Sequence, residues 1–131
     1  MNTIPKPLNE PILNYRPGSP ERISLQARLK ELSAKEIEIP LIIGGAEVRT
    51  GNMSTCVMPH NHGHVLAQFH QAGPAEITQA IDAANAAWAD WSRTALEERA
   101  QIFLKMAKLL TGPYRDTINA ATMLNMSKNA F

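Results

Sequence analysis

The sequence has little of what several classes of protein need. Cys56 is its only cysteine, so no intramolecular disulfide can form, and disulfide-rich secreted scaffolds are excluded. Its 13 basic residues nearly balance 12 acidic ones, and a net charge of +1 argues against nucleic acid as a partner. No apolar run approaches the roughly 18 residues of a membrane span, and residues 1–20 resemble neither a signal peptide nor a mitochondrial presequence. We expect a cytoplasmic protein that binds neither nucleic acid nor membrane.

Large apolar side chains are also scarce. Aromatic residues make up 5% of the 131 residues, whereas alanine occupies 18 positions. A chain of this length can bury roughly two-thirds of its unfolded surface, and here alanine would supply much of the core. The core that the chain can build alone is therefore thin. We expect either a modest helical domain or part of a larger protein.

The first residues predict an arm followed by a helix. Five prolines within the first twenty residues fix φ and remove backbone donors, which favours an extended arm over residues 1–18. Ser19 and Pro20 are typical of a helix start. Leucines spaced i, i+4 and i+7 then predict an amphipathic helix that ends at about Ser33.

The next segment alternates apolar and polar residues, which is typical of strands. We predict a strand over residues 37–43, a two-residue turn at Gly44 and Gly45, and a returning strand over residues 46–49, which together form a β-hairpin. A further strand is predicted over residues 64–70. Three short strands give a small sheet with exposed edges, and such edges invite pairing with other elements.

After Pro74 the apolar period changes from two to 3.6, which predicts a helix to about Ser92. Its apolar stripe consists of Ile77, Ala80, Ile81, Ala84, Trp88 and Trp91. We expect the two tryptophans to lie in a core or an interface.

Two further helices complete the chain. A capping-box match at Thr94 opens the first, which ends at Thr111, and the second begins near Tyr114 and continues to the C-terminus without a clear cap. The apolar stripe of the first is Ile102, Phe103, Met106, Leu109 and Leu110, and the second carries Ile118, Ala121 and Thr122 on one side. The helix to about Ser92 and the helix that ends at Thr111 are joined by a turn near Thr94. As an antiparallel pair they can bury their two stripes against each other, with Phe103 central to the stability of the pair. We nevertheless expect wide apolar faces to stay exposed, and a marginally stable chain that associates.

The histidines are the most conspicuous candidates for a metal site. In an extended segment His60, His62 and His64 would point to one side, where three imidazoles can meet a zinc ion, and His70 follows nearby. Gly63, however, is expected to interrupt the extended geometry, and no paired Cys-x-x-Cys supplies further ligands. We therefore predict no metal site.

Cys56 and the paired glycines do not complete a catalytic or phosphate-binding arrangement. A reactive cysteine needs a setting that stabilises its thiolate and usually a base, and the sequence fixes neither beside Cys56. Gly44 and Gly45 lie in no G-x-G-x-x-G or G-K-[ST] motif. We predict no catalytic, cofactor-binding or metal-binding residue within this chain.

Seven short stretches occur in a recognisable order: NEP at 9–11, PGSPER at 17–22, IPLIIGG at 39–45, NHGHV at 61–65, ERAQIFLK at 98–105, LTGPYR at 110–115 and NAATML at 119–124. Together they resemble the start of 1-pyrroline-5-carboxylate dehydrogenases, a branch of the aldehyde dehydrogenase superfamily. The resemblance covers about residues 9–128. Residues 125–129 depart from it, because NMSKN stands where the family usually has Gly-Gln-(Ser or Gly)-Lys-Thr.

The resemblance implies an α/β fold with a Rossmann-like NAD domain, a catalytic domain and an oligomerisation flap. It implies NAD-dependent oxidation of L-glutamate γ-semialdehyde to glutamate in proline catabolism, by a homo-oligomer. In the family a cysteine attacks the aldehyde, hydride passes to NAD, and a glutamate-activated water releases the product. Those residues and the NAD-binding segments lie beyond Phe131, so Cys56 inherits no role and this chain alone is expected to be inactive. Residues 1–18 would be an arm, and residues 19–131 an incomplete N-terminal portion of the NAD-binding domain.

Other interpretations remain open from the residues alone. The chain can be a non-catalytic interaction module that binds a partner through its tryptophan- and alanine-rich helical faces. It can also be a complete small α+β domain or a small histidine-site metal protein.

Overall fold

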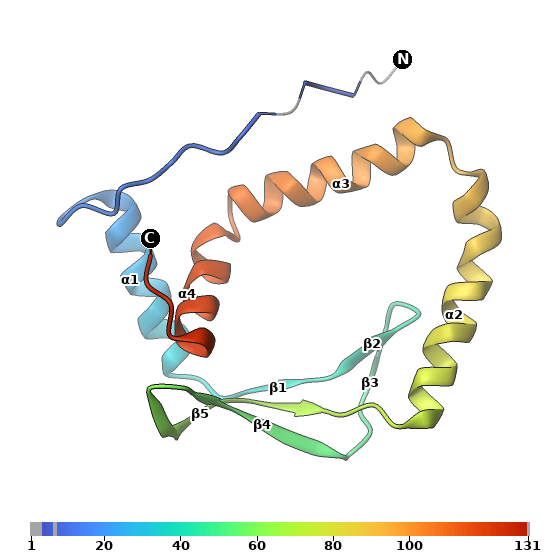
Figure 1. Ribbon diagram of the computed structural model, residues 1–131, viewed down its shortest axis with the longest axis horizontal. Coiled ribbons are helices and arrows are strands. Elements are labelled where there is room, and N and C mark those ends of the chain that lie inside the picture. The colour runs from blue at the N-terminus through green and yellow to red at the C-terminus, as the bar shows by residue number, and fades with distance from the viewer. Residues whose placement is uncertain (1–3, 7, 131) are drawn as a thin grey trace. The chain divides into compact units, whose positions relative to one another are not determined.

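The computed structural model describes residues 4–6 and 8–130, which divide into two compact units (Figure 1). The helical unit is the described part of Met1–Ala34 together with that of Thr94–Phe131. The sheet unit is Lys35–Arg93.

Three helices form the helical unit: α1 (Pro20–Ser33), α3 (Leu96–Thr111) and α4 (Arg115–Met126). The start of α1 is as predicted, because the Ser19 side chain accepts a hydrogen bond from the backbone N–H of Arg22 at 3.4 Å and proline occupies the first turn. A serine at this position satisfies one of the N–H groups that every helix leaves without an intrahelical partner.

The two later helices begin or end differently from the predictions. The N-cap of α3 is Ala95, which makes no side-chain capping hydrogen bond, so the capping box predicted with Thr94 as the N-cap is wrong. The end of α3 at Thr111 is confirmed. The helix α4 does not continue to the C-terminus, because Ser127 takes a left-handed conformation with a φ of 52° after Met126.

The core of the helical unit lies where α1 packs against α4, which run side by side in Figure 1. Tyr15, Leu25 and Ala120 are its buried residues. Around them pack Leu13, Leu29, Leu32, Met123 and Ala130. Ile118 and Ala121, on the side of α4 that the sequence suggested, are exposed. The face of α4 that meets α1 is instead the one that carries Ala120 and Met123.

Five strands and one helix form the sheet unit. A three-stranded sheet has the order β1 (Ile37–Ile39), β5 (Asn61–His70) and β4 (Met53–Met58), with β1 parallel and β4 antiparallel to β5. A separate antiparallel hairpin joins β2 (Leu41–Ile43) to β3 (Ala46–Val48). The helix α2 (Pro74–Arg93) follows β5.

This sheet arrangement corrects the predicted one. The hairpin and its Gly44–Gly45 turn are confirmed, but the single strand predicted over residues 37–43 is two strands in different sheets. Pro40 separates them, because proline cannot donate a ladder hydrogen bond. The strand β4 was not predicted, and β5 begins at Asn61 instead of His64.

The long helices α2 and α3 lie within the described residues, and neither has a buried residue. On α2, Ile81 is 55% exposed and Trp88 69%, and on α3, Phe103 is 64% exposed. The expectation of exposed apolar faces is confirmed, and Phe103 is among the exposed residues. None of the helices in the described residues combines the length and apolarity that crossing a bilayer requires.

Candidate functional site

The histidine-rich segment lies where β4 turns into β5. His60 is in the turn, and His62 and His64 lie on β5. Gly63 lies within β5, but the ladder is irregular around it, as predicted: Val57 pairs with Val65 and Met58 with Asn61, so the register skips residues 62–64 of β5. Among residues 4–6 and 8–130, no three histidine, cysteine, aspartate or glutamate side chains group closely enough to hold a metal ion. That the chain binds no metal stays a prediction.

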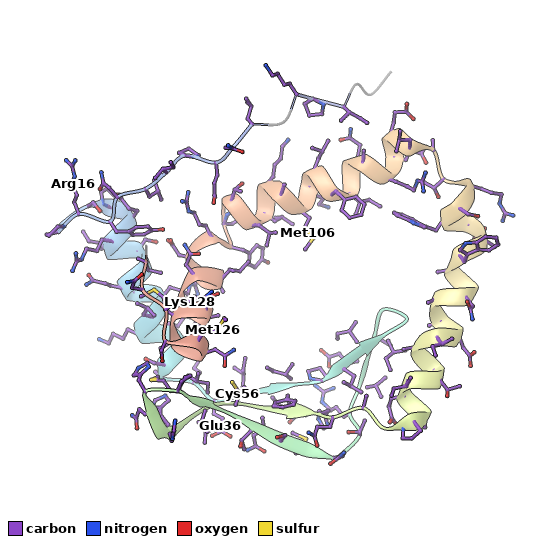
Figure 2. The ribbon with its side chains drawn as sticks, viewed as in Figure 1. Arg16, Glu36, Cys56, Met106, Met126 and Lys128 are labelled. Carbon is purple, nitrogen blue, oxygen red and sulfur yellow. The ribbon has the colours of Figure 1, made fainter. Side chains whose placement is uncertain are left out.

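Cys56 lies in the middle of β4, within the three-stranded sheet (Figure 2). It is half-buried and stands opposite Ala67 of β5 in the strand register. A mid-strand position of this kind is typical of a small packing residue. The prediction that Cys56 has no catalytic role stays a prediction.

Gly44 and Gly45 form the turn of the β2–β3 hairpin. Their φ angles of 60° and 81° are those of a tight two-residue hairpin turn, which requires left-handed residues. A Cβ on Gly44 would lie 3.6 Å from the Cβ of Ala83 on α2, so the turn passes close to that helix. The pair is a turn between strands and does not lead into the N-terminus of a helix, where phosphate-binding glycines are found.

The most connected polar cluster in the sheet unit centres on His70, at the end of β5. His70 is 6% exposed. Its Nδ1 accepts a hydrogen bond from the backbone N–H of Gly51 at 3.1 Å, and its Nε2 lies 3.0 Å from Oε1 of Glu38 on β1. Because Nδ1 accepts, the proton of the neutral ring is on Nε2, which donates to the carboxylate.

Arg49 extends this cluster. Its Nε donates to Oε1 of Glu38 at 2.9 Å, and its Nη1 donates to Oε2 of Glu47 at 2.7 Å. The hydrogen bond from His70, followed by that from Arg49, holds the pKa of Glu38 below its ordinary value. The two carboxylates in turn raise the pKa of Arg49, with Glu47 the larger contributor.

This cluster has the residue types of an acid–base site, but it has no ring nitrogen free to accept a proton. Both ring nitrogens of His70 are engaged, so the imidazole has no lone pair left with which to take a proton from a substrate. What it does is connect β1, β5 and the segment after β3. In the sequence, His70 stands out only as a neighbour of the metal candidates. The one available signal was Glu38 on a predicted strand, with Arg49 at the end of the predicted hairpin. Only the parallel β1–β5 register brings Glu38 to His70.

An apolar groove of about 430 Å³ lies between β2 and the first half of α2. Its lining is Leu41, Ile42, Ile43, Ala72, Glu76, Ile77, Ala80, Ile81 and Ala84. Glu76 is the charged member, and its Oε2 accepts a hydrogen bond from the backbone N–H of Gly73 at 2.8 Å, at the start of α2. Small-molecule sites have this size but need several convergent polar groups. The groove has the character of a packing surface.

Comparisons with known proteins place these elements in a family. A sequence profile of the aldehyde dehydrogenase family matches residues 47–130. The delta-1-pyrroline-5-carboxylate dehydrogenase of Agaricus bisporus is 45% identical over 129 residues, which are 98% of this chain and 24% of that protein. The mitochondrial delta-1-pyrroline-5-carboxylate dehydrogenase of Homo sapiens is 44% identical over 123 residues, 94% of this chain and 22% of that protein.

The backbone of this chain also matches that of a solved structure of the same kind of enzyme. The crystal structure of delta-pyrroline-5-carboxylate dehydrogenase from Mycobacterium tuberculosis with bound NAD matches with a TM-score of 0.87 and 41% identity, over 92% of this chain and 23% of that one. The chain spans about a quarter of the length of the relatives it matches. Since the profile covers most of the chain and the relatives align with nearly all of it, the resemblance and the α/β fold are confirmed, and the chain belongs to the aldehyde dehydrogenase family.

Proposed function

We propose that the chain is the N-terminal part of an NAD-dependent dehydrogenase that oxidises L-glutamate γ-semialdehyde, derived from 1-pyrroline-5-carboxylate, to glutamate in proline catabolism. One observation carries this proposal. Relatives with that enzyme name align with more than nine-tenths of the chain at 41–45% identity, in sequence and in backbone. The alternative of a free-standing helical interaction module accounts for the exposed helices, but not for the agreement across the arm and the sheet.

The described residues do not fit a bound dinucleotide. A helix N-terminus is the usual site for a pyrophosphate, but each of the four helices carries a carboxylate in its first turn, and such a charge repels phosphate. These residues are Glu21, Glu76, Glu97, Glu98 and Asp116. We therefore assign NAD binding and the catalytic groups to the part of the dehydrogenase outside this chain. The chain's own contribution is a scaffold.

The domain assignment, assembly and compartment belong to the same proposal. Residues 19–131 would form an incomplete portion of the NAD-binding domain, preceded by an arm over residues 1–18, and the whole enzyme would be a homo-oligomer. That the protein is located in the cytoplasm stays a prediction. The human and mouse relatives are mitochondrial by name, whereas the name of the Agaricus relative gives no compartment. Fractionation of cells that express the whole polypeptide would decide between the two compartments.

A chimaera tests the function directly. The aligned quarter of the Mycobacterium tuberculosis enzyme is replaced by this chain, and NADH formation from glutamate γ-semialdehyde is measured. We expect NAD-dependent turnover by the chimaera and none above a no-protein blank by the 131-residue chain alone.

A matched pair of variants controls for folding. Ala120 is fully buried and Ala121 is exposed on the same helix. Ala120→Asp should abolish turnover by placing a carboxylate in the α1–α4 core, and Ala121→Asp should preserve it. A chimaera that folds and binds NAD but does not oxidise the semialdehyde would contradict the proposed function.

A further inference from the structure

The groove between β2 and α2 runs along the edge of a strand. Leu41, Ile42 and Ile43 are consecutive, and all three line it. Because successive side chains of a strand point to opposite faces, a cavity that touches three in a row must follow the strand's edge. The opposite wall is the apolar side of α2, where Ile77 and Ile81 are each more than half exposed.

The backbone of this edge has free hydrogen-bonding capacity. The hairpin has two strands, with Ile43 opposite Ala46 and Ile42 opposite Glu47. Beside a two-residue turn the first pair is the hydrogen-bonded one, so the N–H and C=O of Ile42 point away from β3. Ile42 itself is 67% exposed. A two-stranded hairpin is also marginally stable until a further element covers it.

A strand edge beside an aliphatic helix face selects an extended, apolar segment that pairs with the edge and fills the groove with alternate side chains. The groove presents one charged side chain, Glu76, whose carboxylate already accepts the Gly73 N–H. The occupant therefore needs aliphatic side chains at the groove positions and no charge there.

We infer that this groove receives an extended apolar segment from the three quarters of the dehydrogenase that lie outside this chain, which adds a strand beside β2. The inference rests on the proposed function. The relatives hold this chain's counterpart in one polypeptide more than four times as long, with the same local backbone. A segment tethered in the same polypeptide has a high effective concentration, and it therefore outcompetes a second copy of this chain.

Amide hydrogen exchange at Ile42 tests the strand pairing. In the isolated 131-residue chain we expect this amide to exchange at nearly the rate of an unfolded peptide. In the chimaera it should slow by at least a hundredfold. An Ile42 amide that exchanges at the same rate in both proteins would overturn the inference.

Cysteine labelling tests occupancy of the groove without reference to activity. In a Cys56→Ser background, Ile81→Cys lies in the groove, and Gln79→Cys lies on another side of α2 as the matched control. Both should react rapidly with a maleimide in the isolated chain, as followed by peptide mass spectrometry. In the chimaera the groove cysteine should react at least tenfold more slowly, with the control little changed.

The outcomes separate the two proposals. Protection of Ile81→Cys in a chimaera that does not oxidise the semialdehyde would keep the groove assignment and reject the function. Equal reactivity of both cysteines in the chimaera, active or not, overturns the groove assignment. Protection that appears in the isolated chain as its concentration rises would identify a second copy as the occupant and overturn it as well.

Discussion

The contacts that stabilise each unit internally join residues at very different separations along the sequence. In the helical unit, the guanidinium of Arg115 donates to the carbonyl of Pro11 at 3.2 Å, and Nδ2 of Asn119 donates to the hydroxyl of Tyr15 at 3.2 Å. These partners are 104 residues apart. In the sheet unit, β4 pairs with β5, the next strand along the chain, and β2 with β3.

Their cores differ in chemistry as well. The helical unit buries Leu25 and Ala120 together with Tyr15, and its core is an apolar contact between α1 and α4. The sheet unit buries Met58 and Ala67 and, unlike the helical unit, also a histidine whose ring is hydrogen-bonded on both sides. The helical unit should therefore respond to lost apolar volume, whereas the sheet unit should respond to lost polar partners as well.

The largest expected effect is the loss of Leu25, which is 3% exposed. Leu25→Ala removes a buried side chain and leaves a cavity between α1 and α4, so the free energy of unfolding should fall by about 2–5 kcal/mol. Urea denaturation measures the change. Amide exchange should accelerate in α1 and α4 and stay unchanged in β4 and β5.

Ile23→Ala is the matched control for this comparison. Ile23 lies on the same helix but is 58% exposed, so its truncation should change stability by no more than about 0.5 kcal/mol. Equal acceleration of exchange in both units after Leu25→Ala would mean that they unfold as one cooperative body, and the contrast between them would disappear.

The same contrast explains what the sequence could predict. Features set by neighbouring residues were found: the Ser19 cap, the Gly44–Gly45 turn and the end of α3 at Thr111. Each depends on conformational preferences of a few adjacent residues. The family was also readable, because short stretches in collinear order do not require knowledge of the contacts.

Features set by distant residues were missed. Nothing local to α4 indicates that Ala120, instead of Ile118, faces α1. The strand β4 was missed for a local reason instead: it carries few large β-branched or aromatic residues, and its pairing with the next strand includes a register shift. The His70 cluster forms because β1 pairs with the edge of β5 that is opposite to β4. No periodicity in the sequence indicates this strand order.

Substitution of the buried His70 should lower the stability of the sheet unit by a smaller amount. His70→Phe keeps an aromatic ring of similar size but leaves the Gly51 N–H without its acceptor. Gly51 is itself exposed, so water can reach its N–H, and the cost should be that of one ordinary hydrogen bond, about 0.5–1.5 kcal/mol, measured by denaturation. Amides of residues 50–52 should exchange faster.

His62→Phe serves as the control, because His62 is an exposed residue on the same strand. Its effect should stay within about 0.5 kcal/mol. His70→Gln, which can still accept a hydrogen bond, should recover part of the loss. A fully neutral His70→Phe would show that the sheet unit, like the helical unit, is held by apolar burial and the backbone ladder alone.

The smallest effect is a pH dependence at Glu38. Because the His70 and Arg49 hydrogen bonds lower its folded pKa, Glu38 contributes stability that is present above the unfolded pKa of about 4.3 and is lost as pH falls through the folded value. The stability gap between the wild type and Glu38→Gln should therefore be constant above about pH 5.5 and narrow on acidification below that unfolded value. Glu38 is half exposed, so the gap should be small. The His70→Phe background lacks the His70 hydrogen bond, which is the larger cause of the lowered Glu38 pKa. In that background the stability gap should narrow less on acidification. A gap that narrows as much as before would assign the pKa shift to Arg49 instead.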